Sequence, residues 1–204
     1  ANAPHTDAPP ISDDESRPHR PHIVIILGDD VGWANAGWHN PNTLTPRMDA
    51  LVSGHAVELD RHYVFFYCSP SRASMLSGRL PLHVTENNKY ACSPEGALPL
   101  RMKHTLASRL RDVGYATHHV GKWHLGQHHA SSLPVGRGFD HSLGYLGGGE
   151  DHYTNENGGC GNCGKKIDLW RDHAPARGEA DGTYSAYRYA AEARSIIDAH
   201  AGSE

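Results

Sequence analysis

The sequence lacks several features that would place it in a specialised class of protein. No apolar run approaches the roughly 18 to 20 residues that a membrane-spanning helix needs, and the longest aliphatic stretch, residues 23–27, has the length of one strand. Only four cysteines occur in 204 residues, too few for a small protein built on disulfides. Lysine and arginine total 19 against 23 acidic residues, so no excess of positive charge attracts nucleic acid. We therefore expect neither an integral membrane protein nor a nucleic-acid-binding protein.

The amino-terminal region carries little information about location. The chain begins at Ala1 without an initiator methionine and without a basic-then-apolar leader, so localisation has to be inferred indirectly. Residues 1–21 hold five prolines among polar residues, and this composition predicts a disordered arm. Residues 22–204 are long enough for one α/β domain. The 17 histidines would add positive charge as the pH falls, which suits an acidic compartment.

Local patterns predict an α/β order of elements. Residues 22–27 form an unbroken, largely β-branched run that ends at a glycine, the pattern of a strand buried on both faces. Proline near the start, apolar spacing and glycine at the end predict helices, which we place at residues 46–55, 68–78, 105–113 and 184–200. Residues 63–67 and 115–120 are strand-like, and the glycine-rich residues 136–164 are predicted to be mostly loop.

Two adjacent carboxylates, Asp29 and Asp30, follow the first predicted strand. The carboxyl end of a strand is where α/β sheets place ligands, and carboxylate oxygens are ligands for Ca²⁺ or Mg²⁺. The alternative is a loop whose aspartates cap a helix. Two carboxylates alone supply fewer than the six or more oxygens that Ca²⁺ takes.

Cys68 lies at the predicted junction between a strand and a helix, followed by Pro70, Ser71 and Arg72. Its side chain would face the amide groups at the positive end of the helix dipole, with a guanidinium nearby, and an anion could bind there. The alternative is a small buried apolar side chain, which is what most cysteines without a partner are.

Lys122 and His124 are two residues apart in the segment Gly-Lys-Trp-His-Leu-Gly. If the segment is extended, both side chains project to one face while Trp123 packs behind them. A cation and a titratable imidazole on one face suit an anionic substrate. A purely structural edge strand is an equal alternative for this hexapeptide in isolation.

Taken together and in this order, the three segments resemble the type I sulfatases of the alkaline-phosphatase-like superfamily. The resemblance runs from residue 22 to about residue 152, and residues 68–72 match the family's Cys-x-Pro-Ser-Arg maturation signal, followed by the expected Leu76 and Gly78. Residues 138–152 look closest to the arylsulfatase B-like branch. The resemblance implies an α/β fold in which a mostly parallel sheet lies between helices, here apparently truncated.

The resemblance also implies a chemistry. A maturation enzyme would oxidise Cys68 to formylglycine, whose hydrate carries two hydroxyls; one attacks the sulfur and displaces the alcohol, and the other collapses to the aldehyde and expels sulfate. Arg72 would steady the hydrate and the carboxylates of the metal site. Lys122 would contact the sulfate, and His124 would hydrogen-bond a formylglycine hydroxyl.

By the same resemblance, Asp29 and Asp30 are ligands of one Ca²⁺ ion that polarises the sulfate. Asp151 and His152 are candidates for the mouth of the substrate site. Family members continue well beyond this length and supply a second Asp-Asn metal pair, which we do not find after Asp30. We therefore expect residues 22–204 to be the amino-terminal part of a sulfatase catalytic domain, binding the ion weakly, and we hypothesise a fragment or a truncated paralogue.

The other cysteines allow several interpretations. Cys160 and Cys163 could be half of a zinc site with His152 and His173, a redox pair, or part of a loop disulfide. The disulfide is favoured because this sulfatase branch is secretory or lysosomal, so the resemblance predicts a lysosomal or extracellular location. Cys92 has no obvious partner in this chain.

The leading hypothesis is a hydrolase of aryl or carbohydrate sulfate esters. The nearest enzymatic alternative is a phosphoesterase or phosphonate hydrolase of the same superfamily. Two further alternatives are a catalytically inactive protein that binds an anion, a metal or a partner chain, and a histidine-rich metal-binding module.

Overall fold

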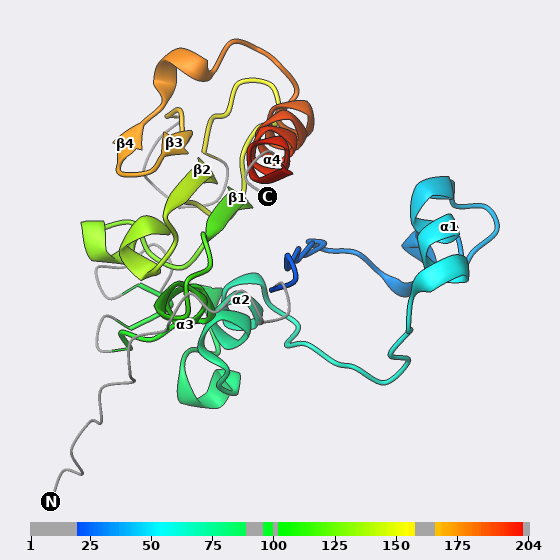
Figure 1. Ribbon diagram of the computed structural model, residues 1–204. Helices are drawn as coiled ribbons and strands as arrows, with labels where there is room; N and C mark the ends of the chain where they lie inside the picture. The colour runs from blue at the N-terminus through cyan, green and yellow to red at the C-terminus, as the bar shows by residue number, and fades with distance from the viewer. Residues whose placement is uncertain (1–19, 89–95, 100–101, 158–165, 202–204) are drawn as a thin grey trace, which may run out of the picture. The chain divides into compact units, whose positions relative to one another are not determined.

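The computed structural model describes residues 20–88, 96–99, 102–157 and 166–201 (Figure 1). They divide into two compact units, Ala1–Glu58 (unit 1) and Leu59–Glu204 (unit 2). The proline-rich arm predicted for residues 1–21 lies almost entirely outside the described residues. None of the helices in the described ranges combines the length and apolar character needed to cross a membrane.

Unit 1 contains the 3-10 helix η1 (Trp33–Asn35) and the helix α1 (Pro46–His55). α1 is confirmed where the sequence predicts it, with Pro46 in the first turn, where a missing backbone N–H costs nothing. The Thr45 hydroxyl ties the start of α1 to the preceding loop, because it accepts from the Gly37 amide at 2.8 Å and donates to Asp49 at 2.8 Å.

The prediction of a buried strand at residues 22–27 is wrong. The structure has no strand there, and the whole segment is exposed, Ile26 to 91%. A strand needs hydrogen-bond partners along its edges and cover on its faces. No strand among the described residues pairs with this segment, so its composition alone does not make it a strand.

Unit 2 contains most of the regular structure. Its helices and strands are α2 (Cys68–Ser77), η2 (Pro81–His83), α3 (Leu106–Asp112), β1 (His118–Lys122), η4 (Ala130–Ser132), η5 (Val135–Arg137), β2 (His141–Tyr145), β3 (Trp170–Arg171), β4 (Ala174–Pro175), η7 (Arg177–Glu179) and α4 (Ser185–Ala201). The predicted helices α2, α3 and α4 are confirmed, and Gly78 ends α2 in the left-handed conformation, with φ of 65°. Residues 63–67 are not a strand, so Cys68 follows irregular chain.

The sheet of unit 2 has the order β1-β2-β3-β4. β1 and β2 are parallel, in a register that runs from His118 opposite His141 to Lys122 opposite Tyr145, whereas the other neighbouring pairs are antiparallel. The predicted α/β class is confirmed, with a mixed sheet. β2 lies inside residues 136–164, a stretch predicted to be mostly loop, and is a strand that the sequence did not indicate.

A pair of glycines explains why the sequence does not indicate the strand at residues 141–145. Gly121 of β1 lies opposite Gly144 of β2, and a Cβ added to Gly144 would stand 1.9 Å from the Gly121 carbonyl oxygen. Only glycine fits this close approach of the two backbones. Glycine weakens the strand signal in the sequence, although here it permits the strand pairing.

The core of unit 2 packs around Trp123, whose indole N–H donates to the carbonyls of Ser132 at 2.9 Å and Gly126 at 3.2 Å. The buried cluster comprises Ala73, Leu76, Ala97, Leu98, Trp123, Leu125, Leu133 and Leu146. It joins α2 to the segment after β1, and this packing positions the site described below.

Polar contacts join α4 to the sheet, and Figure 1 shows α4 beside β1 and β2. The His118 and His200 imidazoles meet at 3.0 Å. Glu192 accepts from His141 at 2.6 Å and from Arg171 at 2.8 Å. Several of the scattered histidines in the sequence therefore connect elements rather than form a separate site.

Candidate functional site

α2 presents Cys68 at its first turn. Tyr67 precedes it in an extended conformation, and its carbonyl accepts the Ser71 amide at 3.2 Å. Cys68 is half-buried and carries a thiol rather than half of a disulfide. The first amides of a helix point outward and give that end a partial positive charge, which favours a bound anion there.

Ser69 fixes this end of α2 against the segment that follows β1. It is fully buried, its amide donates to the Asn88 side chain at 2.9 Å, and its hydroxyl donates to the His124 carbonyl at 2.9 Å. The residue next to Cys68 is thus bonded directly to one of the predicted site residues. Sequence reasoning missed this role because the contact joins positions 55 residues apart.

Arg72 makes a second connection between the same two segments. It lies one turn after Cys68, on the same side of α2, and its guanidinium donates to the Lys122 carbonyl at 2.8 Å. Lys122 is the half-buried last residue of β1. The structure therefore brings together the predicted residues Cys68, Arg72, Lys122 and His124 within unit 2.

His124 is held in an unusual position. It is only 4% exposed, and its backbone has φ of 54°, so the condition of an extended segment from Lys122 through His124 is not met at His124. Its amide donates to the Leu146 carbonyl at 3.3 Å. A Cβ added to Gly148 would stand 2.7 Å from Nε2 of the His124 ring, so only glycine leaves room for the imidazole. A left-handed backbone at a non-glycine residue is often found where function requires it.

Sequence reasoning did not single out His119, which affects the charge near Arg72. Its ring packs edge-on against Trp123 and Phe139. Burial, followed by the charge of Arg72, lowers the pKa of His119 to about 4. His119 is therefore uncharged near neutral pH and does not repel Arg72. His119 and the buried Trp123 are an even number of positions apart, and side chains at such a spacing lie on the same face of extended chain. This alternation was the signal available in the sequence.

Asp29 and Asp30 belong to unit 1. Both are exposed, and Asp30 has φ of 52° at a bend. Two adjacent carboxylates offer hard oxygen ligands of the kind that Ca²⁺ and Mg²⁺ prefer, so the donor chemistry fits part of such a site.

Asp151 and His152, predicted at the substrate mouth, are exposed. Asp151 accepts the amides of Tyr153 at 3.0 Å and Thr154 at 2.8 Å, and these bonds lower its pKa. His152 contacts the first residue of α4, its ring lying 2.9 Å from the Ser185 hydroxyl. Both residues thus support a turn, and their role toward substrate stays a prediction.

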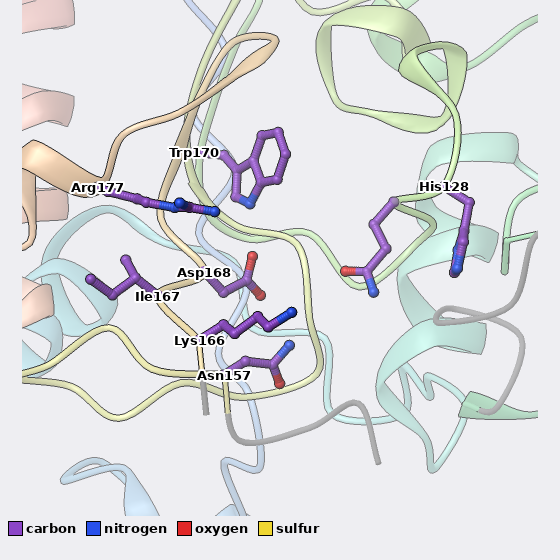
Figure 2. Close-up of a pocket in the computed structure, with 8 residues that line it drawn as sticks. His128, Asn157, Lys166, Ile167, Asp168, Trp170 and Arg177 are labelled. Carbon is purple, nitrogen blue, oxygen red and sulfur yellow. The ribbon is translucent and has the colours of Figure 1, made fainter. Parts of the chain in front are cut away.

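A pocket with a volume of about 280 Å³ lies in unit 2, and Figure 2 shows it. It is lined by Gln127, His128, Asn157, Lys166, Ile167, Asp168, Trp170 and Arg177. The sequence assigned none of these residues to a site, because they come from segments up to 50 positions apart. The other cysteines, Cys92, Cys160 and Cys163, lie outside the described residues.

The model of the Sulfatase family matches residues 21–203. The chain belongs to the sulfatase family. It is 35% identical over 185 residues to mouse arylsulfatase J, covering 89% of this chain and 30% of that protein. It is 45% identical over 131 residues to rat arylsulfatase G, covering 64% of this chain and 24% of that protein.

A third sulfatase relative is dog N-acetylgalactosamine-6-sulfatase, which is 34% identical over 136 residues, covering 62% of this chain and 26% of that protein. The crystal structure of Ps i-CgsB in complex with k-i-k-neocarrahexaose superposes with a TM-score of 0.71 at 24% identity, covering 84% of this chain and 40% of that one. This likeness establishes the fold. The chain spans about a quarter to a third of the length of the curated relatives it matches.

Proposed function

We propose that the sulfatase containing this chain hydrolyses sulfate esters at the site around Cys68. The observation that carries the proposal is the pair of bonds from α2 to the segment after β1, Arg72 to the Lys122 carbonyl and Ser69 to the His124 carbonyl. They join the start of the helix that carries Cys68 and Arg72 to the backbone of Lys122 and His124, and this supports a site in which a helix start, cations and an imidazole act on an anionic ester.

Cys68 is the proposed precursor of a formylglycine made by a maturation enzyme. Its half-buried place at the start of α2 fits a group that must both reach substrate and be held by the helix. Once formed and hydrated, this group supplies a hydroxyl nucleophile and a second hydroxyl for release of sulfate.

The other residues of the site have distinct proposed roles. Lys122 and Arg72 neutralise and orient the sulfate, Arg72 with its guanidinium fixed at the Lys122 carbonyl. His124, held between Leu146 and Gly148, holds or moves a proton at a ring nitrogen. The buried setting of His124 excludes water and strengthens these interactions.

Asp29 and Asp30 are the proposed ligands for one Ca²⁺ ion, which would polarise a sulfate oxygen when bound. The relative named N-acetylgalactosamine-6-sulfatase supports a sulfated carbohydrate as the substrate class. Relatives of this family support a secretory, lysosomal or extracellular location.

The test combines mass spectrometry with turnover. Top-down mass spectrometry of the protein from its native source should show the mass deficit of a thiol converted to an aldehyde at residue 68. That protein should release sulfate from 4-nitrophenyl sulfate faster than phosphate from 4-nitrophenyl phosphate. An intact Cys68 thiol without turnover would refute the proposal, and a higher phosphate rate would identify a phosphoesterase.

Variants test the geometry directly. Ser69→Ala removes the donor to the buried His124 carbonyl, and leaving such a group unpaired costs about 1–3 kcal/mol. We expect kcat to fall about tenfold or more, with Cys68 still converted. Arg79→Ala, at an exposed position just beyond α2, is the matched control and should retain full kcat. Equal rates for both variants would show that the Ser69 contact does not position the site.

A further inference from the structure

Arg137, the last residue of η5, is buried although its side chain carries a full charge. Only 4% of the residue is exposed, and burial lowers the pKa of its guanidinium. Among the described residues, no carboxylate forms an ion pair with it. Burying a charge is costly, and arginines are almost never fully buried unless they are paired. The hydrogen bonds of Arg137 therefore indicate what this residue does.

The guanidinium of Arg137 binds one short stretch of backbone before α3. It donates to the carbonyls of Met102 at 3.0 Å and Pro99 at 3.4 Å, and also to the carbonyl of Leu98. A guanidinium offers five donors in a rigid, planar fork, whereas a lysine ammonium is a compact point charge. Arginine is thus the side chain best suited to hold several carbonyls at once.

The backbone of Arg137 is fixed in turn by the start of α3. Thr105 caps that helix, and its hydroxyl donates to the Arg137 carbonyl at 2.5 Å. The Arg137 amide donates to the Pro134 carbonyl at 2.9 Å. Both Thr105 and Arg137 are buried, so the guanidinium projects from a segment that is itself held in place.

The stretch that Arg137 holds contacts the chain immediately after His124. The amides of Ala97 and Leu98 donate to the Leu125 carbonyl at 3.0 and 3.2 Å. Leu98 thus accepts from Arg137 through its carbonyl and donates to Leu125 through its amide. A single residue connects the buried guanidinium to the neighbour of a proposed catalytic residue.

His124 needs such support because its backbone is left-handed, with φ of 54°. A residue other than glycine keeps this conformation only where its surroundings fix it. Leu146 accepts the His124 amide, and Ser69 donates to the His124 carbonyl. Leu125 is the next point of attachment along the chain. If Leu125 were released, the backbone at His124 could relax, and the direction of the imidazole would change with it.

We propose that Arg137 is a positioning residue for His124: by holding the carbonyls of residues 98, 99 and 102, it fixes the chain after His124 and so the direction of the imidazole. Arg137 acts through the backbone, without a contact to substrate. A misplacement of about 1 Å can reduce an enzymatic rate about 100-fold, so a residue outside the site can control kcat. The effect on kcat rests on the proposed sulfatase function, whereas the positioning itself does not.

The test uses the sulfatase that contains this chain, produced in its native host, with the variants Arg137→Lys and Arg137→Gln. Each new side chain keeps donors for the carbonyls but lacks the fork, and circular dichroism checks that each variant is folded. We expect kcat for 4-nitrophenyl sulfate to fall about tenfold or more, with KM nearly unchanged. Glu192→Ala is the matched control, because it weakens unit 2 at the contact of α4 with the sheet, and it should keep full kcat.

The imidazole of His124 gives a readout that general destabilisation does not move. In protein labelled with ¹⁵N at histidine, the ring nitrogen signals of His124, assigned by their loss in His124→Gln, are followed against pH. The midpoint should shift in both Arg137 variants and stay in place in Glu192→Ala. An unchanged midpoint in the folded Arg137 variants would overturn the positioning role, whatever their kcat.

The same experiment separates this proposal from the proposed function. If the unaltered protein releases no sulfate, the proposed hydrolysis is refuted, and a shifted His124 midpoint in both Arg137 variants still supports the positioning. If the unaltered protein releases sulfate and folded Arg137→Lys and Arg137→Gln do so at the same kcat, the control of kcat by Arg137 is refuted and the hydrolysis stands.

Discussion

His119 makes the stability of unit 2 depend on pH in a way that can be calculated. The folded protein lowers the pKa of His119 from 6.5 to about 4, so the unfolded chain takes up a proton at a higher pH than the folded chain. The contribution of neutral His119 is complete above about pH 6.5 and is lost progressively as the pH falls toward 4. Between pH 7 and pH 5, linkage gives a loss of about 2 kcal/mol in the free energy of unfolding.

The assay is urea unfolding at pH 7 and pH 5, followed by circular dichroism, for the unaltered chain and for His119→Gln. The glutamine does not titrate, so its variant should lose about 2 kcal/mol less over this interval. Comparing the two proteins removes the contributions of other histidines, including His118, whose pKa burial also lowers. Equal losses in both proteins would refute the argument that protonation of His119 opposes folding.

Two other substitutions test the sheet and its contact with α4. Gly144→Ala should destabilise unit 2 by about 3 kcal/mol, since the new Cβ would collide with the Gly121 carbonyl; the fall in melting temperature measures it. Glu192→Ala removes the partner that Arg171 and His141 share and should cost about 1–2 kcal/mol in urea unfolding.

Each of these two substitutions has a matched control. Gly149→Ala adds a methyl group where no atom lies within 4 Å, and its melting temperature should match that of the unaltered chain. Asp198→Asn, at an exposed position of α4, should leave unfolding nearly unchanged. A Gly144→Ala protein as stable as Gly149→Ala, or a Glu192→Ala protein as stable as Asp198→Asn, would contradict the corresponding contact.

Local signals explain what could be predicted of the fold. Proline in the first turn, apolar spacing and a terminal glycine are properties of a helix itself, and one or more of these signals marks each of α1, α2, α3 and α4, which lie where the sequence placed them. A strand depends on partners elsewhere in the chain. The run at residues 22–27 therefore suggested a strand that the structure lacks, and Gly144 concealed the strand β2, which pairs with Gly121.

The candidate site likewise contains residues that local motifs indicate and residues that depend on tertiary contacts. Cys68, Arg72, Lys122 and His124 could be proposed from the sequence because their motifs are short and specific, and the structure connects the two segments that carry them. The residues that hold them were not found. Ser69 and His119 act through tertiary contacts that leave no spacing pattern, and the lining of the pocket comes together only after the sheet forms.

The two bonds that build the site also set an order of events during synthesis. Ser69 and Arg72 contact residues 55 and 50 positions later in the chain, and Ser69 and Pro70 are fully buried once these contacts form. At about 5–20 residues per second, translation needs roughly 3 to 11 s to cover that separation. An enzyme that modifies Cys68 by recognising the residues beside it must therefore act within that interval or on a chain kept unfolded. If Cys68 is the formylglycine precursor proposed above, the folding that forms these contacts also removes Ser69 and Pro70 from the reach of the enzyme that converts it.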